Sequence, residues 1–148
     1  MAVRVGINGF GRIGRNFFRA ARESTAFEIV AANDIGSAEQ LAHLLRYDSI
    51  LGRYPGQISH GQNSIQVDGK ELEILSTRSP GDIDWAGLGV DLVVESSGVF
   101  TKADQARLHI DRGGAKKVII TAPAPDAVSY THLDVYKRQL SSRRWSPV

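Results

Sequence analysis

The sequence contains no cysteine, and this absence removes two kinds of chemistry. No disulfide can form, and no thiolate can act as a nucleophile. A protein without disulfides suits a reducing compartment, so we expect a cytoplasmic location.

Long apolar runs are also missing. No stretch approaches the roughly 18 residues that a membrane-spanning helix needs. Near the N-terminus, Arg4 and Asn8 interrupt the apolar residues that a signal peptide would require. We therefore expect no membrane partner.

Excess charge is absent from residues 1–124, which carry 14 basic and 14 acidic side chains. The formal net charge of +2 arises in residues 125–148, where four basic side chains accompany two acidic ones. The sequence therefore does not indicate the basic surface that nucleic acids require, and we expect no nucleic-acid partner.

The most informative segment is a glycine-rich turn between a strand-like run and an amphipathic stretch. Residues 3–7 are mainly apolar, residues 9–14 read Gly-Phe-Gly-Arg-Ile-Gly, and residues 12–22 have helical spacing of apolar side chains. Gly9 permits a tight turn, Gly11 lets a diphosphate approach the main chain, and Gly14 lets the helix pack closely on the strand. The helix N-terminus adds N–H groups and a partial positive charge.

A carboxylate follows at the place where a dinucleotide site needs one. The apolar run 27–32 ends in Asn33 and Asp34, 20 residues beyond Gly14. Asp34 is predicted to accept hydrogen bonds from both ribose hydroxyls of adenosine and to repel a 2′-phosphate, which favours NAD over NADP. The alternative is an ordinary helix cap or turn residue.

The order of elements predicts an α/β fold of the Rossmann type: a doubly wound, mainly parallel sheet with helices on both faces. Thr101 is predicted as the N-cap of the last helix, and Asp68-Gly69 as a hairpin turn. Residues 46–56 are expected to be irregular. The expected strands are 3–8, 27–33, 57–60, 64–68, 71–76, 90–95 and 117–121, and the expected helices are 11–23, 37–45 and 102–112.

Several blocks of sequence, in order and in register, resemble the glyceraldehyde-3-phosphate dehydrogenase family. The resemblance begins with Gly-Ile-Asn-Gly-Phe-Gly-Arg-Ile-Gly-Arg and extends over residues 2 to about 124. Erythrose-4-phosphate dehydrogenase shares much of this pattern but typically has Glu where Asp34 stands, which favours the first family. The matching blocks are residues 6–15, 33–34, 47–49, 52–53, 95–101 and 113–124.

The resemblance implies NAD as the cofactor and a set of residues that bind it. Residues 8–13 would line the diphosphate and the nicotinamide ribose, Asp34 would hold the adenosine ribose, and the main chain of Arg78 would meet the adenine. Ser97, Gly98 and Phe100 would flank the adenosine, and Thr121 would lie on the nicotinamide side. The full predicted set is Asn8, Gly9, Phe10, Gly11, Arg12, Ile13, Asn33, Asp34, Arg78, Ser97, Gly98, Phe100 and Thr121.

Several of these residues have ordinary structural alternatives. Ser97 and Thr121 are also suited to satisfying turns at strand ends, and Phe100 to the core. Arg12 is either a surface residue or a diphosphate contact. Its positive charge is unfavourable at a helix N-terminus, which favours a function.

The sequence offers no metal site and no catalytic residue. The four histidines are scattered and do not share a face with carboxylates at metal-ligand spacing. Two of them, His43 and His109, fall on predicted helices and are expected to be partly buried structural residues. The family's catalytic histidine cannot be carried over to His132, because the resemblance ends before it.

Beyond residue 124 the family would continue to a Ser-Cys-Thr-Thr-Asn-Cys segment, whose first cysteine attacks the aldehyde. Nothing in residues 127–148 matches the family, and all 15 glycines precede residue 115. We therefore predict an NAD-binding domain over 1–126, possibly incomplete in its last part. We predict a tail over 127–148 that is disordered or an artefact of a frame error, a truncated assembly or vector-derived translation.

These observations leave two functional hypotheses. In the first, the chain is the NAD-binding portion of a phosphorylating glyceraldehyde-3-phosphate dehydrogenase, an NAD-dependent aldehyde oxidoreductase of glycolysis, and is inactive alone because it lacks the cysteine nucleophile. In the second, it is a non-catalytic nucleotide-binding module or a fragment of erythrose-4-phosphate dehydrogenase. A phosphorylated aldehyde would be a substrate only of the complete enzyme, whose family members are homo-oligomeric.

Overall fold

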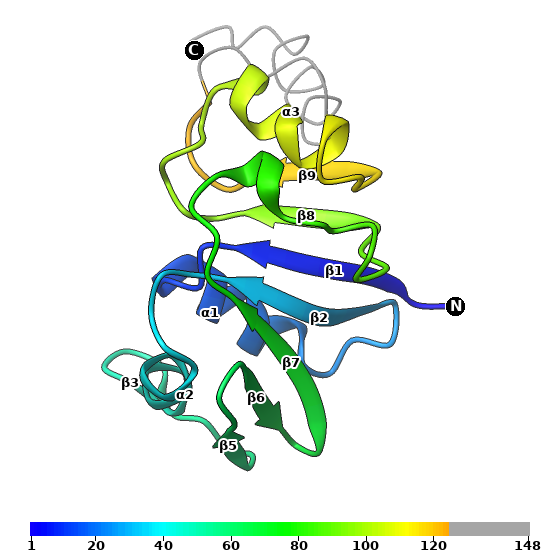
Figure 1. Ribbon diagram of the computed structural model, residues 1–148. Helices are drawn as coiled ribbons and strands as arrows, with labels where there is room; N and C mark the ends of the chain where they lie inside the picture. Colours follow the sequence, from blue (N-terminus) through cyan, green and yellow to red (C-terminus); the bar gives the residue numbers. More distant parts are fainter. Residues whose placement is uncertain (125–148) are drawn as a thin grey trace, which may run out of the picture.

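A computed structural model describes residues 1–124 as one twisted seven-stranded sheet with helices on both faces (Figure 1). The strand order is β5-β6-β7-β2-β1-β8-β9. The elements of the sheet are β1 (Val3–Asn8), β2 (Phe27–Asn33), β5 (Ile58–His60), β6 (Ser64–Val67), β7 (Lys70–Leu75), β8 (Leu92–Glu95) and β9 (Lys117–Ile120). The helices are α1 (Arg12–Ala21), α2 (Ala38–Arg46), α3 (Ala103–Asp111) and the short 3-10 helix η1 (Pro80–Asp82).

Five strands of the sheet are parallel, and β1 is the middle strand of these five. β1 pairs in parallel with β2 on one side and with β8 on the other. β7 and β9 extend the parallel part outward, whereas β5, β6 and β7 form an antiparallel meander at one edge. The chain leaves β1 toward β2 and later returns to the opposite side of β1. In open α/β sheets ligands bind where the strand order reverses in this way, which here is the carboxyl end of β1.

Each face of the sheet has its own apolar core. On one face, Phe18 of α1 and Leu41 and Leu45 of α2 pack with Ile7 of β1. On the other face, Trp85 and Val90 pack with Val93 of β8, and α3 lies against β9 and η1. Figure 1 shows α1 and α2 separated from α3 by the sheet. The predicted Rossmann-type fold with helices on both faces is confirmed.

The structure corrects some local predictions. Lys102, not Thr101, is the N-cap of α3, and its side chain makes no capping hydrogen bond. The segment expected to be irregular contains a two-stranded ribbon of β3 (Tyr47–Asp48) and β4 (Gly52–Arg53). The hairpin at Asp68-Gly69 is confirmed, since both residues have positive φ, at 52° and 80°.

The tail predicted at residues 127–148, and the domain boundary at residue 126, lie outside the described residues. Among residues 1–124, no helix is long and apolar enough to cross a membrane. The same part of the chain holds no group of histidine, cysteine or carboxylate residues placed to bind a metal ion.

Candidate functional site

The glycine turn after β1 is held in close contact with the turn after β8. Gly9 has a φ of +90°, and a Cβ on it would lie 2.5 Å from the main chain of Ser97. A Cβ on Gly14 would lie 2.3 Å from the carbonyl oxygen of Gly9. By contrast, a Cβ on Gly11 would meet nothing within 4 Å. The first and third glycines therefore permit close packing, and the second faces open space.

Helix α1 begins directly after this turn with its N-terminus uncapped by a side chain. Gly11 is the N-cap and no acidic residue lies in the first turn. The helix dipole and the first N–H groups are therefore left to interact with an anion from outside the helix. Arg12 and Ile13, at the start of the helix, are both exposed.

Asp34 lies beside the glycine turn. Its Oδ2 accepts a hydrogen bond from the Phe10 N–H at 2.8 Å, and its Oδ1 accepts one from the Gly36 N–H at 3.1 Å. The side chain is half-buried. An ionised carboxylate accepts about four hydrogen bonds, so these two contacts leave capacity for further donors. Asp34 is thus both a turn residue and an acceptor next to the predicted diphosphate loop.

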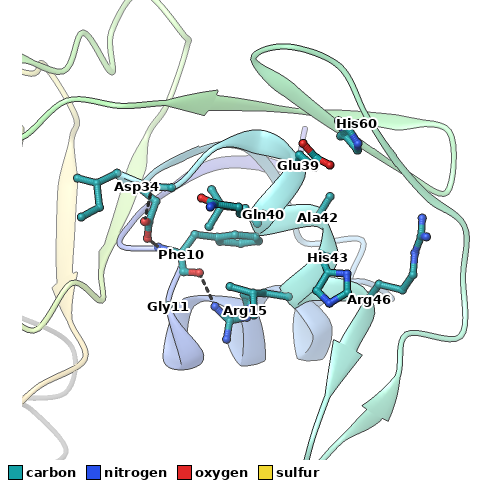
Figure 2. A pocket seen from close by; sticks show the side chains of 14 residues that line it. Phe10, Gly11, Arg15, Asp34, Glu39, Gln40, Ala42, His43, Arg46 and His60 are labelled. Carbon is teal, nitrogen blue, oxygen red and sulfur yellow. Dashed lines mark hydrogen bonds between the residues drawn. The ribbon is translucent and has the colours of Figure 1, made fainter.

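A cavity of about 750 Å³ opens between the glycine turn and α2 (Figure 2). Phe10, Gly11 and Asp34 lie at one end of it, and His43 of α2 and His60 of β5 line it farther from the glycine turn. Its volume falls in the range of about 300–1,000 Å³ that small-molecule sites occupy. The other predicted residues do not line this cavity: Asn8, Gly9, Arg12, Ile13, Asn33, Arg78, Ser97, Gly98, Phe100 and Thr121.

Arg15 also lines the cavity and was not predicted from the sequence. Its Nη1 donates to the Phe10 carbonyl at 2.9 Å, which ties α1 to the glycine turn. Within residues 1–124 its Nε is buried without a hydrogen-bond partner. Burial lowers the pKa of the Arg15 guanidinium from its ordinary value, against the charges of Asp48 and Asp34, which raise it. In the sequence, Arg15 is four residues after Gly11, about one helical turn, and it ends the block 6–15 that resembles the family.

The side chains of Asn8 and Asn33, two of the predicted site residues, form hydrogen bonds with other groups of the protein. Asn33 Nδ2 donates to Asn8 Oδ1 at 2.7 Å and to the Thr77 carbonyl at 2.8 Å. Asn8 Nδ2 donates to Glu95 Oε2 at 2.6 Å. Both residues are buried, so their side chains join strand ends to one another.

Ser97, Gly98 and Phe100, predicted around the adenosine, lie in the segment after β8. Arg78, predicted at the adenine, follows β7, and Thr121, predicted on the nicotinamide side, follows β9. The Ser97 hydroxyl donates to Glu95 Oε1 at 2.5 Å, and Thr121 Oγ1 donates to the Glu95 carbonyl at 3.2 Å. These contacts match the structural alternative for both hydroxyls. Gly98 is exposed with a φ of +73°. Phe100 is half-buried and Arg78 is exposed.

The sequence did not predict the buried contact between Glu95 and His109. His109 is fully buried and lies 2.7 Å from Glu95 Oε2. The expectation of a partly buried residue therefore understates the burial of His109, and it is wrong for His43, which is exposed. The signal available was a glutamate at the end of an otherwise apolar strand.

Comparison with known proteins gives one family and several close relatives. Residues 3–103 match the family model described as glyceraldehyde 3-phosphate dehydrogenase, NAD binding domain. The chain is 59% identical to glyceraldehyde-3-phosphate dehydrogenase of Streptomyces coelicolor over 127 residues, which are 85% of this chain and 38% of that protein. It is 54% identical to the enzyme of Geobacillus stearothermophilus over 124 residues, 84% of this chain and 37% of that protein. The chain thus matches less than two-fifths of the length of these relatives.

Proposed function

Since the chain belongs to the glyceraldehyde-3-phosphate dehydrogenase family, of which it carries the NAD-binding domain, we propose that it binds NAD at the carboxyl ends of β1, β2 and β8. The observation that carries this proposal is the 2.8 Å hydrogen bond between the Phe10 N–H and Asp34. It places a carboxylate acceptor directly beside the glycine turn, so that one ligand is able to meet both.

The residues at this edge fit the chemistry of a dinucleotide. The glycine turn and the uncapped start of α1 would face the diphosphate. The free acceptor capacity of Asp34 would take the hydroxyls of the adenosine ribose. Asn33 and Asn8 would hold the strand ends in place beneath them.

The rest of the predicted set completes the proposed site. Arg12 would approach the diphosphate, since a guanidinium suits an anion and the side chain is exposed there. Ile13 and Thr121 would lie on the nicotinamide side. Arg78, Gly98, Phe100 and the main chain of Ser97 would lie around the adenosine.

We further propose that the complete protein oxidises a phosphorylated aldehyde and passes hydride to NAD, and that residues 1–148 alone do not. The family's reaction begins with attack by a cysteine thiolate, and this chain has no cysteine. Purified chain should therefore produce no NADH from glyceraldehyde 3-phosphate, NAD and phosphate. Turnover above a blank, in a preparation free of host enzyme, would refute this.

The second candidate function is a nucleotide-binding module without catalysis, and the absence of cysteine favours it for this chain taken alone. Erythrose-4-phosphate dehydrogenase is a weaker alternative, because Asp34 is not the glutamate typical of that group. A folded domain over 1–126, a cytoplasmic location and homo-oligomeric assembly of the complete protein are parts of the same proposal. Gel filtration and thermal melting of residues 1–126 test the first of these, and gel filtration of the complete protein tests the last.

Calorimetric titration with NAD and with NADP tests the binding proposal. NAD should bind more tightly, because Asp34 repels a 2′-phosphate. The matched control is Glu39→Gln, which removes a carboxylate from the same cavity but not from the glycine turn, and should leave the preference unchanged. Equal affinity of the unmodified chain for the two nucleotides would refute the role of Asp34.

A further inference from the structure

Five buried polar side chains form a continuous hydrogen-bonded chain next to the glycine turn. Asn33 donates to Asn8 at 2.7 Å, and Asn8 donates to Glu95 at 2.6 Å. His109 Nε2 lies 2.7 Å from Glu95 Oε2, and Trp85 Nε1 donates to His109 Nδ1 at 2.9 Å. Each of the five residues is at most 5% exposed. They come from β2, β1, β8, α3 and the segment after η1.

The donors and acceptors fix the protonation of the histidine. An indole N–H is only a donor, so the Nδ1 of His109 that receives it must be unprotonated. The proton of the neutral imidazole then sits on Nε2 and is donated to Glu95. His109 is therefore a neutral donor to the carboxylate, and Trp85 selects its tautomer.

Glu95 is an ionised carboxylate that accepts hydrogen bonds from residues on both sides of the glycine turn. Its Oε1 accepts from the Ser97 N–H at 2.9 Å and from the Ser97 hydroxyl, while its Oε2 accepts from Asn8 and His109. Burial raises the pKa of the Glu95 carboxyl, but the hydrogen bonds from His109, Ser97 and Asn8 outweigh it and leave that pKa below its ordinary value. The negative charge of Glu95 needs no neighbouring cation, because each of these groups donates a hydrogen bond to the carboxylate.

The two groups that Glu95 holds are the ones that confine Gly9. Asn8 directly precedes Gly9, and the main chain of Ser97 is the surface that a Cβ on Gly9 would strike at 2.5 Å. Ser96 adds a hydroxyl hydrogen bond to the Gly9 carbonyl at 2.7 Å. The position of the glycine turn therefore depends on how the turn after β8 sits, and Glu95 fixes that turn.

We propose that Glu95 is a positioning residue for the dinucleotide: it holds Asn8 and Ser97 on either side of Gly9 and so presents the glycine turn to the diphosphate. His109, oriented by Trp85, keeps the carboxylate in place. This inference rests on the proposed binding of NAD. The competing interpretation is a buried polar cluster that contributes only to the stability of the fold.

A pair of substitutions on β8 separates these interpretations in the full 148-residue chain. Glu95→Gln keeps the shape of the side chain but replaces an acceptor oxygen with a donor, and it should weaken NAD binding about tenfold, as the loss of a hydrogen bond to a charged group does. Val94→Ala removes buried apolar atoms from the neighbouring position, which is 3% exposed. It should lower stability to urea and leave NAD affinity unchanged. Equal effects of the two variants on affinity at matched stability would overturn the proposal.

Two substitutions of His109 test the second half of the proposal by rescue. Glutamine carries an amide nitrogen at the reach of Nε2, so His109→Gln retains a donor to Glu95, whereas His109→Leu retains none. NAD affinity should be near that of the parent for His109→Gln and about tenfold weaker for His109→Leu. If affinity falls equally in both, the donor to Glu95 is not what positions the turn.

Nuclear magnetic resonance spectra recorded without nucleotide test the role of Glu95 separately from the binding of NAD. Glu95→Gln should shift the amide resonances of Gly9 and Ser97, and Val94→Ala should not. Two-bond ¹H–¹⁵N correlations should show His109 as the neutral Nε2–H tautomer at neutral pH. Undisturbed Gly9 and Ser97 amides in Glu95→Gln would refute the positioning role of Glu95, and an imidazolium signal from His109 would refute its orientation by Trp85. If the unmodified chain fails to bind NAD, the proposed function falls, and these spectra still decide the role of Glu95.

Discussion

Two regions of the same sheet are built in opposite ways. At the carboxyl ends of β1, β2 and β8, here called the nucleotide edge, buried Asn8, Asn33 and Glu95 satisfy one another. In the antiparallel meander of β5, β6 and β7, the buried side chains are apolar, including Ile65 and Leu72. Polar contacts of the meander lie nearer its surface, where Asp68 accepts from the Tyr54 hydroxyl at 3.0 Å.

The difference separates the part of the sheet that contributes stability from the part where we propose that NAD binds. Burial of apolar area, at about 25 cal/mol per Å², stabilises the meander. A buried polar group contributes little net stability when its partners are present and costs stability when one is removed. The nucleotide edge therefore gains a defined geometry from its polar groups, and substitutions in the two regions should affect different measurements.

The largest expected effect comes from comparing two glycines that both have a positive φ. Gly9 has a φ of +90° and Gly69, in the meander, a φ of +80°, but only a Cβ on Gly9 would strike other atoms. Gly69→Ala should cost about 1–2 kcal/mol for the left-handed conformation alone. Gly9→Ala should cost about 2–5 kcal/mol, because displacement of the Ser97 main chain adds an overpacking penalty, and it should abolish NAD binding.

Urea unfolding and NAD titration of both variants measure this difference. Similar losses of stability in Gly9→Ala and Gly69→Ala would show that the contact between the glycine turn and the turn after β8 is not rigid. Gly9 would then be no more constrained than a glycine of the meander, and the proposed difference between the two regions would be wrong.

Removal of apolar atoms from the meander should affect stability alone. Leu72 is 1% exposed, and Leu72→Ala should lower the free energy of unfolding by about 3 kcal/mol, counting both lost transfer energy and the cavity left behind. NAD affinity, measured by calorimetry well below the melting temperature, should not change. A parallel fall in affinity would show that the two regions are coupled through β2.

A charge substitution at the nucleotide edge should have the converse effect. Asp34→Asn retains an oxygen that accepts from the Phe10 N–H but loses the charge that repels a 2′-phosphate. The preference for NAD over NADP should fall about tenfold, equivalent to about 1.4 kcal/mol, while stability changes little. The ratio of the two dissociation constants is the measurement, and an unaltered ratio would contradict the prediction.

The smallest expected effect is a pH dependence of stability that originates at the nucleotide edge. Since the folded-state pKa of Glu95 lies below its ordinary value of 4.5, its stabilising contribution is fully present above that value and is lost as pH falls through the folded-state pKa. In Glu95→Gln this part of the acid dependence should disappear. Urea titrations at a series of pH values from neutral to acidic, for the parent and the variant, measure it. Parallel curves would assign the acid dependence to other carboxylates.

The sequence predicted the parts of the fold that depend on local pattern. The bounds of β1 and β2 follow from apolar runs next to turn residues, and the Asp68-Gly69 hairpin follows from residues that tolerate positive φ. Local pattern was insufficient at Thr101, because N-cap preference places a boundary only to within a residue or two. The ribbon of β3 and β4 has only two residues in each strand, which is too short for any periodicity to show.

The site was predictable to the extent that one segment determines it. The glycine turn and Asp34 carry their chemistry in residue type and spacing, and the structure places them within one hydrogen bond of each other. The contacts of Glu95 with Asn8 and His109 were not predictable, since they join β8 to residues 87 and 14 positions away. The shape of the cavity along α2 depends likewise on how that helix packs on the sheet.

The pairing of β1 with β8 has a consequence for the order in which the molecule folds. The register joins Asn8 to Glu95, whereas in the meander Val67 lies opposite Lys70. Closing a long loop costs more chain entropy than closing a short one, so we expect the hairpin to form early and the pairing of β1 with β8 to form late. During synthesis, β1 cannot complete its pairing with β8 until the chain has been made as far as residue 95. We therefore expect the proposed cofactor site to be among the last parts of the described fold to form. A nucleotide would then bind only after the sheet has assembled.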